Sequence, residues 1–324
     1  MDYRAATLRG TRGASEALTQ LGLKEKIKEG LRQIDIFDCL KQLDIVTVCR
    51  PLDGLLGAFT THNQTSGVLI STNRRLPIQR FTAAHELGHF WLKHGTSVDS
   101  EASINAIRNG SQVPFQEIEA EAFAAEFILP KALVGYTIRR QNYAQPELKM
   151  PEVIYQLSLR LGVSYSATRV ALQNFRFISQ RESQLAAKVQ PKQIKQALLS
   201  EFGLTASHPD VFHLTEYDND GYILSSEDDI MILDLPEHST SGFAWSDLSQ
   251  NENLQTLFDL HVNDSGRAIG GMSRRKIVVQ GSAIAKVMTS EKRPWEMDRD
   301  ALHQFGITLD FRGKESGLPR AFNQ

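Results

Sequence analysis

Apolar residues recur at helical spacing in the first half of the chain and predict several helices. Residues 82–92 favour a helix that Thr82 caps, because alanine and leucine are frequent there and no proline interrupts it. The other helices expected on this pattern cover residues 14–23, 26–43 and 114–130. β-Branched runs predict strands at 45–49, 56–60 and 67–71, the last two as a hairpin at a sheet edge where an extended peptide can pair.

The pattern changes in the second half of the chain. Residues 153–161 and 165–175 predict two helices around a tight turn, with Gly162 ending the first and Ser164 capping the second. This spacing fits a helix-turn-helix, and four arginines add local positive charge: Arg160, Arg169, Arg176 and Arg181. One more amphipathic helix is expected at 184–202. Short strands then follow at 221–224, 229–233, 275–280 and 307–311.

Composition narrows the class of protein. The 324 residues suffice for two or three domains, and the net charge of −2 gives no global case for nucleic-acid or membrane binding. The two cysteines, Cys39 and Cys49, are too few for a disulfide framework and are expected as buried free thiols, with a single stabilising disulfide as the alternative. The start of the chain lacks a signal-peptide pattern and no apolar run spans a membrane, so we expect a cytoplasmic protein with no membrane partner.

The helix at 82–92 carries the strongest chemical signal. His85 and His89 are four residues apart, so both imidazoles leave one helix face and can bind a single Zn²⁺ ion. Glu86 lies beside such a metal and can act as general base for water, the arrangement of an HExxH peptidase motif. The alternative is a surface helix that happens to hold these three residues.

A third protein ligand is expected from the helix at 114–130. Glu117 is the preferred residue, and Glu119, on nearly the opposite face, is the reserve. Glu121 is four residues from Glu117, so one carboxylate can bind metal while the other orients a histidine. An oxyanion donor is also needed, and the candidates, among which the sequence does not choose, are His94, the nearby tyrosines and Arg169.

Residues 79–89 (QRFTAAHELGH) and the Glu-x-x-Ala-Glu-x-Phe-Ala-Ala pattern at 117–125 resemble the ImmA/IrrE family of metallopeptidases. The resemblance covers residues 30–180. It implies a small mixed α/β zincin in which His85, His89 and Glu117 bind Zn²⁺ and Glu86 is the catalytic base. Members of that family usually carry Asn or Asp at the position of Glu121.

Three turn regions of the C-terminal part resemble the loops of the chagasin family, immunoglobulin-like inhibitors of cysteine peptidases. They are residues 238–245, 266–272 and 292–295, and the best matches are Gly270-Gly271 and Arg293-Pro294-Trp295. This resemblance implies a β-sandwich recognition module whose loops bind a protein partner or the substrate.

The expected fold is therefore α+β in three parts. A zincin-like metallopeptidase domain covers residues 1–140, a helix-turn-helix-like segment covers 141–204, and an all-β immunoglobulin-like sandwich covers 205–324. The expected function is a zinc endopeptidase that cleaves a specific protein. The family resemblance implies a transcriptional repressor or a regulator of phage defence or stress response as substrate. The alternatives are a non-catalytic sensor or inhibitor with a structural metal site, and a DNA-binding regulator.

Overall fold

The computed structural model describes residues 2–63, 65–100, 114–206, 208–246, 248, 252–263, 273–296 and 300–320. Its contacts divide the chain into two compact units. The N-terminal unit contains residues 1–139, 157–183 and 314–324, and the C-terminal unit contains residues 140–156 and 184–313. The three consecutive domains expected from the sequence stay a prediction.

The helices of the N-terminal unit differ from the predicted ones in their bounds. Helix α1 (Tyr3–Gln20) begins well before the predicted start, because Asp2 caps it by accepting a hydrogen bond from the Ala5 amide. The predicted helix at 26–43 is wrong as a single element: α2 (Leu23–Lys28) ends near Gly30, whose φ is +112°, and α3 (Ile36–Gln42) begins anew with Asp35 as its cap. Helix α6 (Phe115–Ile128) ends before Pro130 as predicted, and α7 (Lys131–Arg140) follows.

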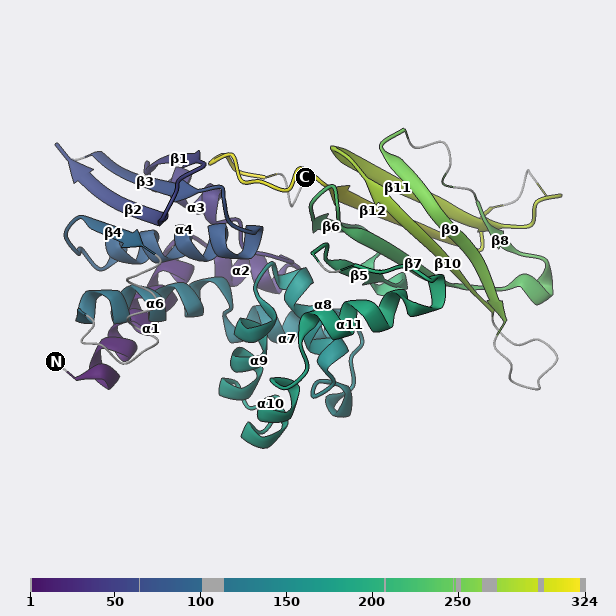
Figure 1. Ribbon diagram of the computed structural model, residues 1–324, viewed down its shortest axis with the longest axis horizontal. Coiled ribbons are helices and arrows are strands. Elements are labelled where there is room, and N and C mark those ends of the chain that lie inside the picture. The colour runs from purple at the N-terminus through teal and green to yellow at the C-terminus, as the bar shows by residue number, and fades with distance from the viewer. Residues whose placement is uncertain are drawn as a thin grey trace. The chain divides into compact units, whose positions relative to one another are not determined.

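A four-stranded sheet of order β1-β3-β2-β4 packs against helix α4 (Leu76–Trp91), as Figure 1 shows. Strand β1 (Val46–Arg50) is parallel to β3 (Thr65–Ser71), and β2 (Leu55–His62) is antiparallel to both β3 and β4 (Ser97–Ser100). The hairpin β2–β3 confirms the prediction. Its expected place at a sheet edge is wrong, because β1 and β4 pair with its outer sides.

The two helices around Gly162 form as predicted. Helix α8 (Pro151–Leu161) ends at Gly162, and Ser164 caps α9 (Tyr165–Asn174) by accepting from the Ala167 amide. Arg160 is buried, and Arg169 donates to the Ser183 side chain. Two of the four arginines that suggested DNA binding are thus held within the fold, and DNA binding stays a prediction.

The C-terminal unit contains two four-stranded sheets. The first has the order β5-β7-β10-β9, formed by Val211–Leu214, Ile230–Glu237, Ser273–Gly281 and Leu254–Asn263. The second has the order β6-β12-β11-β8, formed by Gly221–Leu224, His303–Asp310, Ile284–Lys292 and Ala244–Trp245. The predicted strands are all present, whereas β5, β8, β9 and β11 were not predicted. The immunoglobulin-like sandwich stays a prediction.

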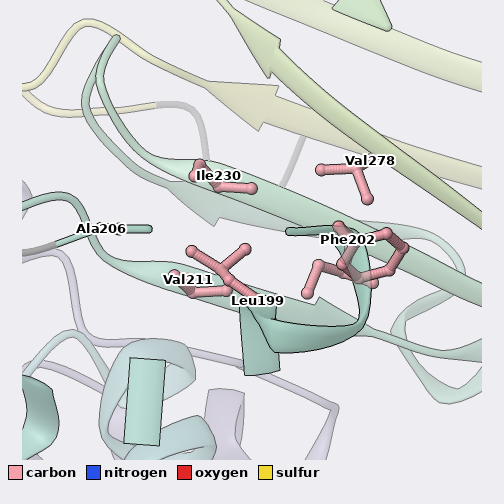
Figure 2. Close-up of a cluster of buried hydrophobic side chains, with 7 residues drawn as sticks. Leu199, Phe202, Ala206, Val211, Ile230 and Val278 are labelled. Atoms are coloured by element: carbon pink, nitrogen blue, oxygen red, sulfur yellow. The ribbon is translucent and has the colours of Figure 1, made fainter. Parts of the chain in front are cut away.

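Helical residues before the strands complete the core of the C-terminal unit. The predicted helix at 184–202 is instead α10 (Gln180–Ala186), α11 (Pro191–Leu199) and a 3₁₀ turn at Ser200–Phe202, because Pro191 cannot continue a helix. Figure 2 shows Leu199 and Phe202 packing against Val211, Ile230 and Val278 of the first sheet. This apolar cluster joins the end of the helical segment to the strands.

Both cysteines are free thiols, as expected, with Cys39 buried and Cys49 partly so. Burial raises the pKa of Cys39 to about 12 and that of Cys49 to about 11. Among the described helices, none combines the length and apolar character needed to cross a membrane.

Candidate metal centre

Helix α4 (Leu76–Trp91) carries the HExxH motif. It begins at Leu76 with Pro77 in its first turn, so the predicted cap Thr82 is wrong and that residue lies buried within the helix. His85 and His89 leave the same face, and their Nε2 atoms are 3.1 Å apart. Both imidazoles are buried.

Glu117 on α6 joins the two histidines. Its Oε2 atom lies 3.2 Å from His85 Nε2 and 3.6 Å from His89 Nε2. Zinc bonds of about 2.0–2.1 Å in tetrahedral geometry place neighbouring ligand atoms about 3.3 Å apart. The three donor atoms therefore fit the corners of one face of a zinc tetrahedron, and two imidazoles with one carboxylate are a common set for catalytic zinc.

The pKa of Glu117 lies well below its usual range. Burial alone raises this pKa, but the hydrogen bonds with His85 and His89 and their charges outweigh the burial. The carboxyl group is therefore ionised near neutral pH, as a metal ligand must be.

Small residues bring these elements together. A Cβ atom at Gly88 would lie 3.2 Å from both the Ala120 Cα and the Phe123 Cβ, so the glycine permits the close approach of α4 and α6. A Cβ atom at Gly57 on β2 would lie 2.7 Å from Glu86 Oε1 and 2.4 Å from a methyl group of Thr82. Strand β2 thus passes directly over the carboxylate of Glu86, which is completely buried.

A chain of hydrogen bonds extends from His89 away from Glu117. His89 Nδ1 lies 3.0 Å from His94 Nδ1, His94 Nε2 lies 2.8 Å from Glu119 Oε2, and Arg9 Nη1 donates to both Glu119 oxygens at 2.9 and 3.1 Å. If His89 Nε2 keeps its lone pair for a metal, His89 Nδ1 carries the proton and donates to His94. His94 then donates from Nε2 to Glu119. Burial lowers the pKa of His94, which agrees with this neutral tautomer.

Glu119, the second choice for the third metal ligand, thus lies away from His85 and His89. It contacts His94 and Arg9, while Glu117 faces the two histidines. Glu121 is exposed on α6, and Arg169 bonds to Ser183 rather than to the motif. Sequence reasoning missed the role of Arg9, which is distant along the chain. It named His94 only as an oxyanion donor, although its position five residues after His89 was a usable signal.

The loops that resembled chagasin are described in part. Residues 266–272, with Gly270-Gly271, lie outside the described residues. The other two loops contact each other: a Cβ atom at Gly242 would lie 2.5 Å from the Trp295 ring, and Arg293 lies over the Phe243 ring at 4.7 Å. Trp245 is buried and Trp295 is 69 % exposed, so only the first is a core residue.

Part of the chain matches the model of a peptidase family. Residues 40–173 match the family model of the IrrE N-terminal-like domain, Peptidase_M78. The matched range contains His85, Glu86, His89 and Glu117, together with His94 and Glu119. This match supports a metallopeptidase-type function for the N-terminal unit.

Two solved structures are similar to part of the chain. One is the cysteine protease inhibitor EhICP2 from Entamoeba histolytica, with 19 % identity over 33 % of this chain and 100 % of that protein, at a TM-score of 0.30. The other is Amebosin, with 21 % identity over 32 % of this chain and 97 % of that protein, at a TM-score of 0.27. No curated protein matches the chain.

Proposed function

We propose that this protein is a zinc metallo-endopeptidase that cleaves a specific protein within the cell. The observation that carries the proposal is the convergence of His85, His89 and Glu117 from two helices, with Glu86 on the next position of α4. The match to a peptidase family over the same residues supports it.

Each side chain has a distinct task. His85, His89 and Glu117 hold the ion, which when bound supplies Lewis acidity toward water and toward the peptide carbonyl. Glu86 takes the proton of the attacking water and passes it to the nitrogen of the leaving amine. The buried position of Glu86 keeps bulk water from competing for that proton.

The hydrogen-bond chain from His89 to Arg9 keeps the ligand oriented. The buried side chain of Glu119 accepts a hydrogen bond from His94, and Arg9 compensates its negative charge. In this arrangement His94 and Glu119 are positioning residues, and neither contacts the substrate.

The proposed substrate is a protein such as a transcriptional repressor of a phage-defence or stress response. We propose that the loops at 238–245 and 292–295 bind the substrate or a partner protein. The second candidate function is that of a regulator that binds DNA through α8 and α9.

Glu86→Gln tests the catalytic part of this proposal. The amide keeps the shape of the side chain but cannot accept the proton, so zinc content should stay equal to that of the wild type while peptide cleavage falls about 10²–10⁴-fold. Glu121→Gln, an exposed change on α6, is the matched control and should leave both quantities unchanged. Equal cleavage by Glu86→Gln and the wild type would exclude the assigned base. A structural metal site would give zinc in both proteins and cleavage in neither.

A further inference from the structure

A second cluster of histidine and glutamate lies in the C-terminal unit. Glu291 on β11 is directly opposite His303 on β12 in the strand register, and His238 follows the last residue of β7. His303 Nδ1 is 2.7 Å from Glu291 Oε2, and His238 Nδ1 is 3.0 and 3.2 Å from the two Glu291 oxygens. One donor atom from each residue lies within 4.8 Å of the other two.

The charge of Glu291 makes this cluster unusual. The Glu291 side chain is completely buried, and it contacts the imidazoles of His238 and His303 and the His238 amide. The nearby Arg293 pairs with Glu296 instead. A buried carboxylate is stabilised by a positive charge beside it. A divalent cation between the three donor atoms would supply it.

The donor set indicates which cation fits. Two imidazole nitrogens and one carboxylate oxygen suit Zn²⁺, Co²⁺ or Ni²⁺, whereas Ca²⁺ and Mg²⁺ prefer oxygen ligands alone. The His238 and His303 side chains are partly exposed, so the ion has a path to the site and an open side for water or a ligand from a partner. The two imidazole rings are stacked, with centroids 5.4 Å apart.

We propose that His238, Glu291 and His303 form a second transition-metal site of the Zn²⁺ class. The ion would link the end of β7, in the first sheet, to β11 and β12 in the second sheet. It would also fix the start of the 238–245 loop, because His238 immediately precedes the turn at Ser239–Ser241. Metal occupancy therefore sets the conformation of a loop that the proposed function assigns to protein binding. The site itself does not depend on the peptidase assignment.

The neighbouring pair of His261 and Glu237 provides an internal control. His261 Nδ1 lies 2.7 Å from Oε2 of Glu237, whose side chain is also completely buried, but it brings only one imidazole to that carboxylate. A single His–Glu pair lacks the ligands for a stable transition-metal site. His261→Ala should therefore leave metal binding unchanged.

The test is a titration of the full-length, tag-free apoprotein with Co²⁺, in which the visible absorption of the bound ion reports binding. We expect two equivalents for the wild type, two for His261→Ala, and one each for His303→Ala and Glu291→Gln. His89→Ala should also bind one, and the double variant His89→Ala/His303→Ala should bind none. Glu291→Gln preserves the shape of the buried side chain, so it remains informative if His303→Ala does not fold.

Two results would overturn the proposal. One is a wild-type stoichiometry of one equivalent that is lost in His89→Ala, which would leave only the centre on α4. The other is a second equivalent that persists in both His303→Ala and Glu291→Gln, which would place the site elsewhere. Either result leaves the peptidase assignment untouched, because that assignment depends on the first equivalent.

Discussion

Removal of the His94 imidazole should weaken metal binding without removing any metal ligand. In His94→Ala the Nδ1 proton of His89 loses its acceptor, which lies 3.0 Å away in the wild type. Glu119 simultaneously loses the donor at 2.8 Å and keeps its ion pair with Arg9, so its buried carboxylate no longer acts on His89 through an intervening imidazole. His89 can then rotate and adopt the tautomer that cannot bind the ion.

The expected loss of metal affinity follows from the kind of partner that His89 loses. Loss of an outer partner of a metal-bound histidine typically costs about 10–100-fold in affinity, equivalent to about 1.4–2.7 kcal/mol. Glu119→Gln should lower the metal affinity by a smaller factor. It removes the negative charge, but the amide oxygen still accepts the hydrogen bond from His94. The double variant should be no weaker than His94→Ala alone, because both changes break the same chain of bonds.

Competition for Zn²⁺ against a chromophoric chelator measures these affinities. The matched control is His62→Ala, which removes an exposed histidine from the same unit and should leave the affinity unchanged. A His94→Ala protein that folds normally and binds Zn²⁺ at the first site with wild-type affinity would refute the positioning role. Additive losses in the double variant would show that the two residues act separately.

Three further predictions concern the fold around the centre. Gly162→Ala should destabilise the N-terminal unit by about 2–4 kcal/mol, because φ is +67° there and the added Cβ would lie 2.0 Å from a nitrogen of the buried Arg80; urea unfolding measures the loss. Arg320→Ala should cost about 3–5 kcal/mol by leaving the buried carboxylate of Glu315 without its partner at 2.9 Å, and an unchanged midpoint would contradict this. Cys39 should resist thiol reagents at pH 8 in the native protein and react after unfolding. Its pKa of about 12 leaves only roughly 10⁻⁴ of the thiol ionised at that pH, and fast native labelling would disagree.

Periodicity and motif spacing were sufficient to predict the helices that carry the candidate ligands and the shared face of His85 and His89. The buried residues Ala120, Phe123, Ala124 and Phe127 of α6 follow the helical period, and the i, i+4 spacing of His85 and His89 on α4 fixes their common face whatever surrounds them. The choice between Glu117 and Glu119 needed the rotation of α6 about its axis. The sequence shows that Glu117 and Glu119 lie on different faces of α6, but not which face packs against α4. That packing decides which carboxylate faces the histidines.

Other features depend on contacts between segments that are far apart in the chain. Arg9 meets Glu119 only because α1 packs against α6, and no local pattern encodes that pairing. The His238, Glu291 and His303 cluster combines a strand end with a strand pair, so spacing along the chain carries no signal for it. The division of residues 26–43 into two helices could have been predicted from the sequence, because Gly30 and the capping Asp35 interrupt the apolar pattern there.

Anomalous diffraction at the zinc absorption edge, from crystals of the zinc-loaded Glu86→Gln full-length protein, tests the central assignment most directly. The account predicts a peak within bonding distance of His85 Nε2, His89 Nε2 and a Glu117 oxygen, about 2.0–2.2 Å from each. A peak bound instead by Glu119, or the absence of any peak at His85 and His89, would contradict it.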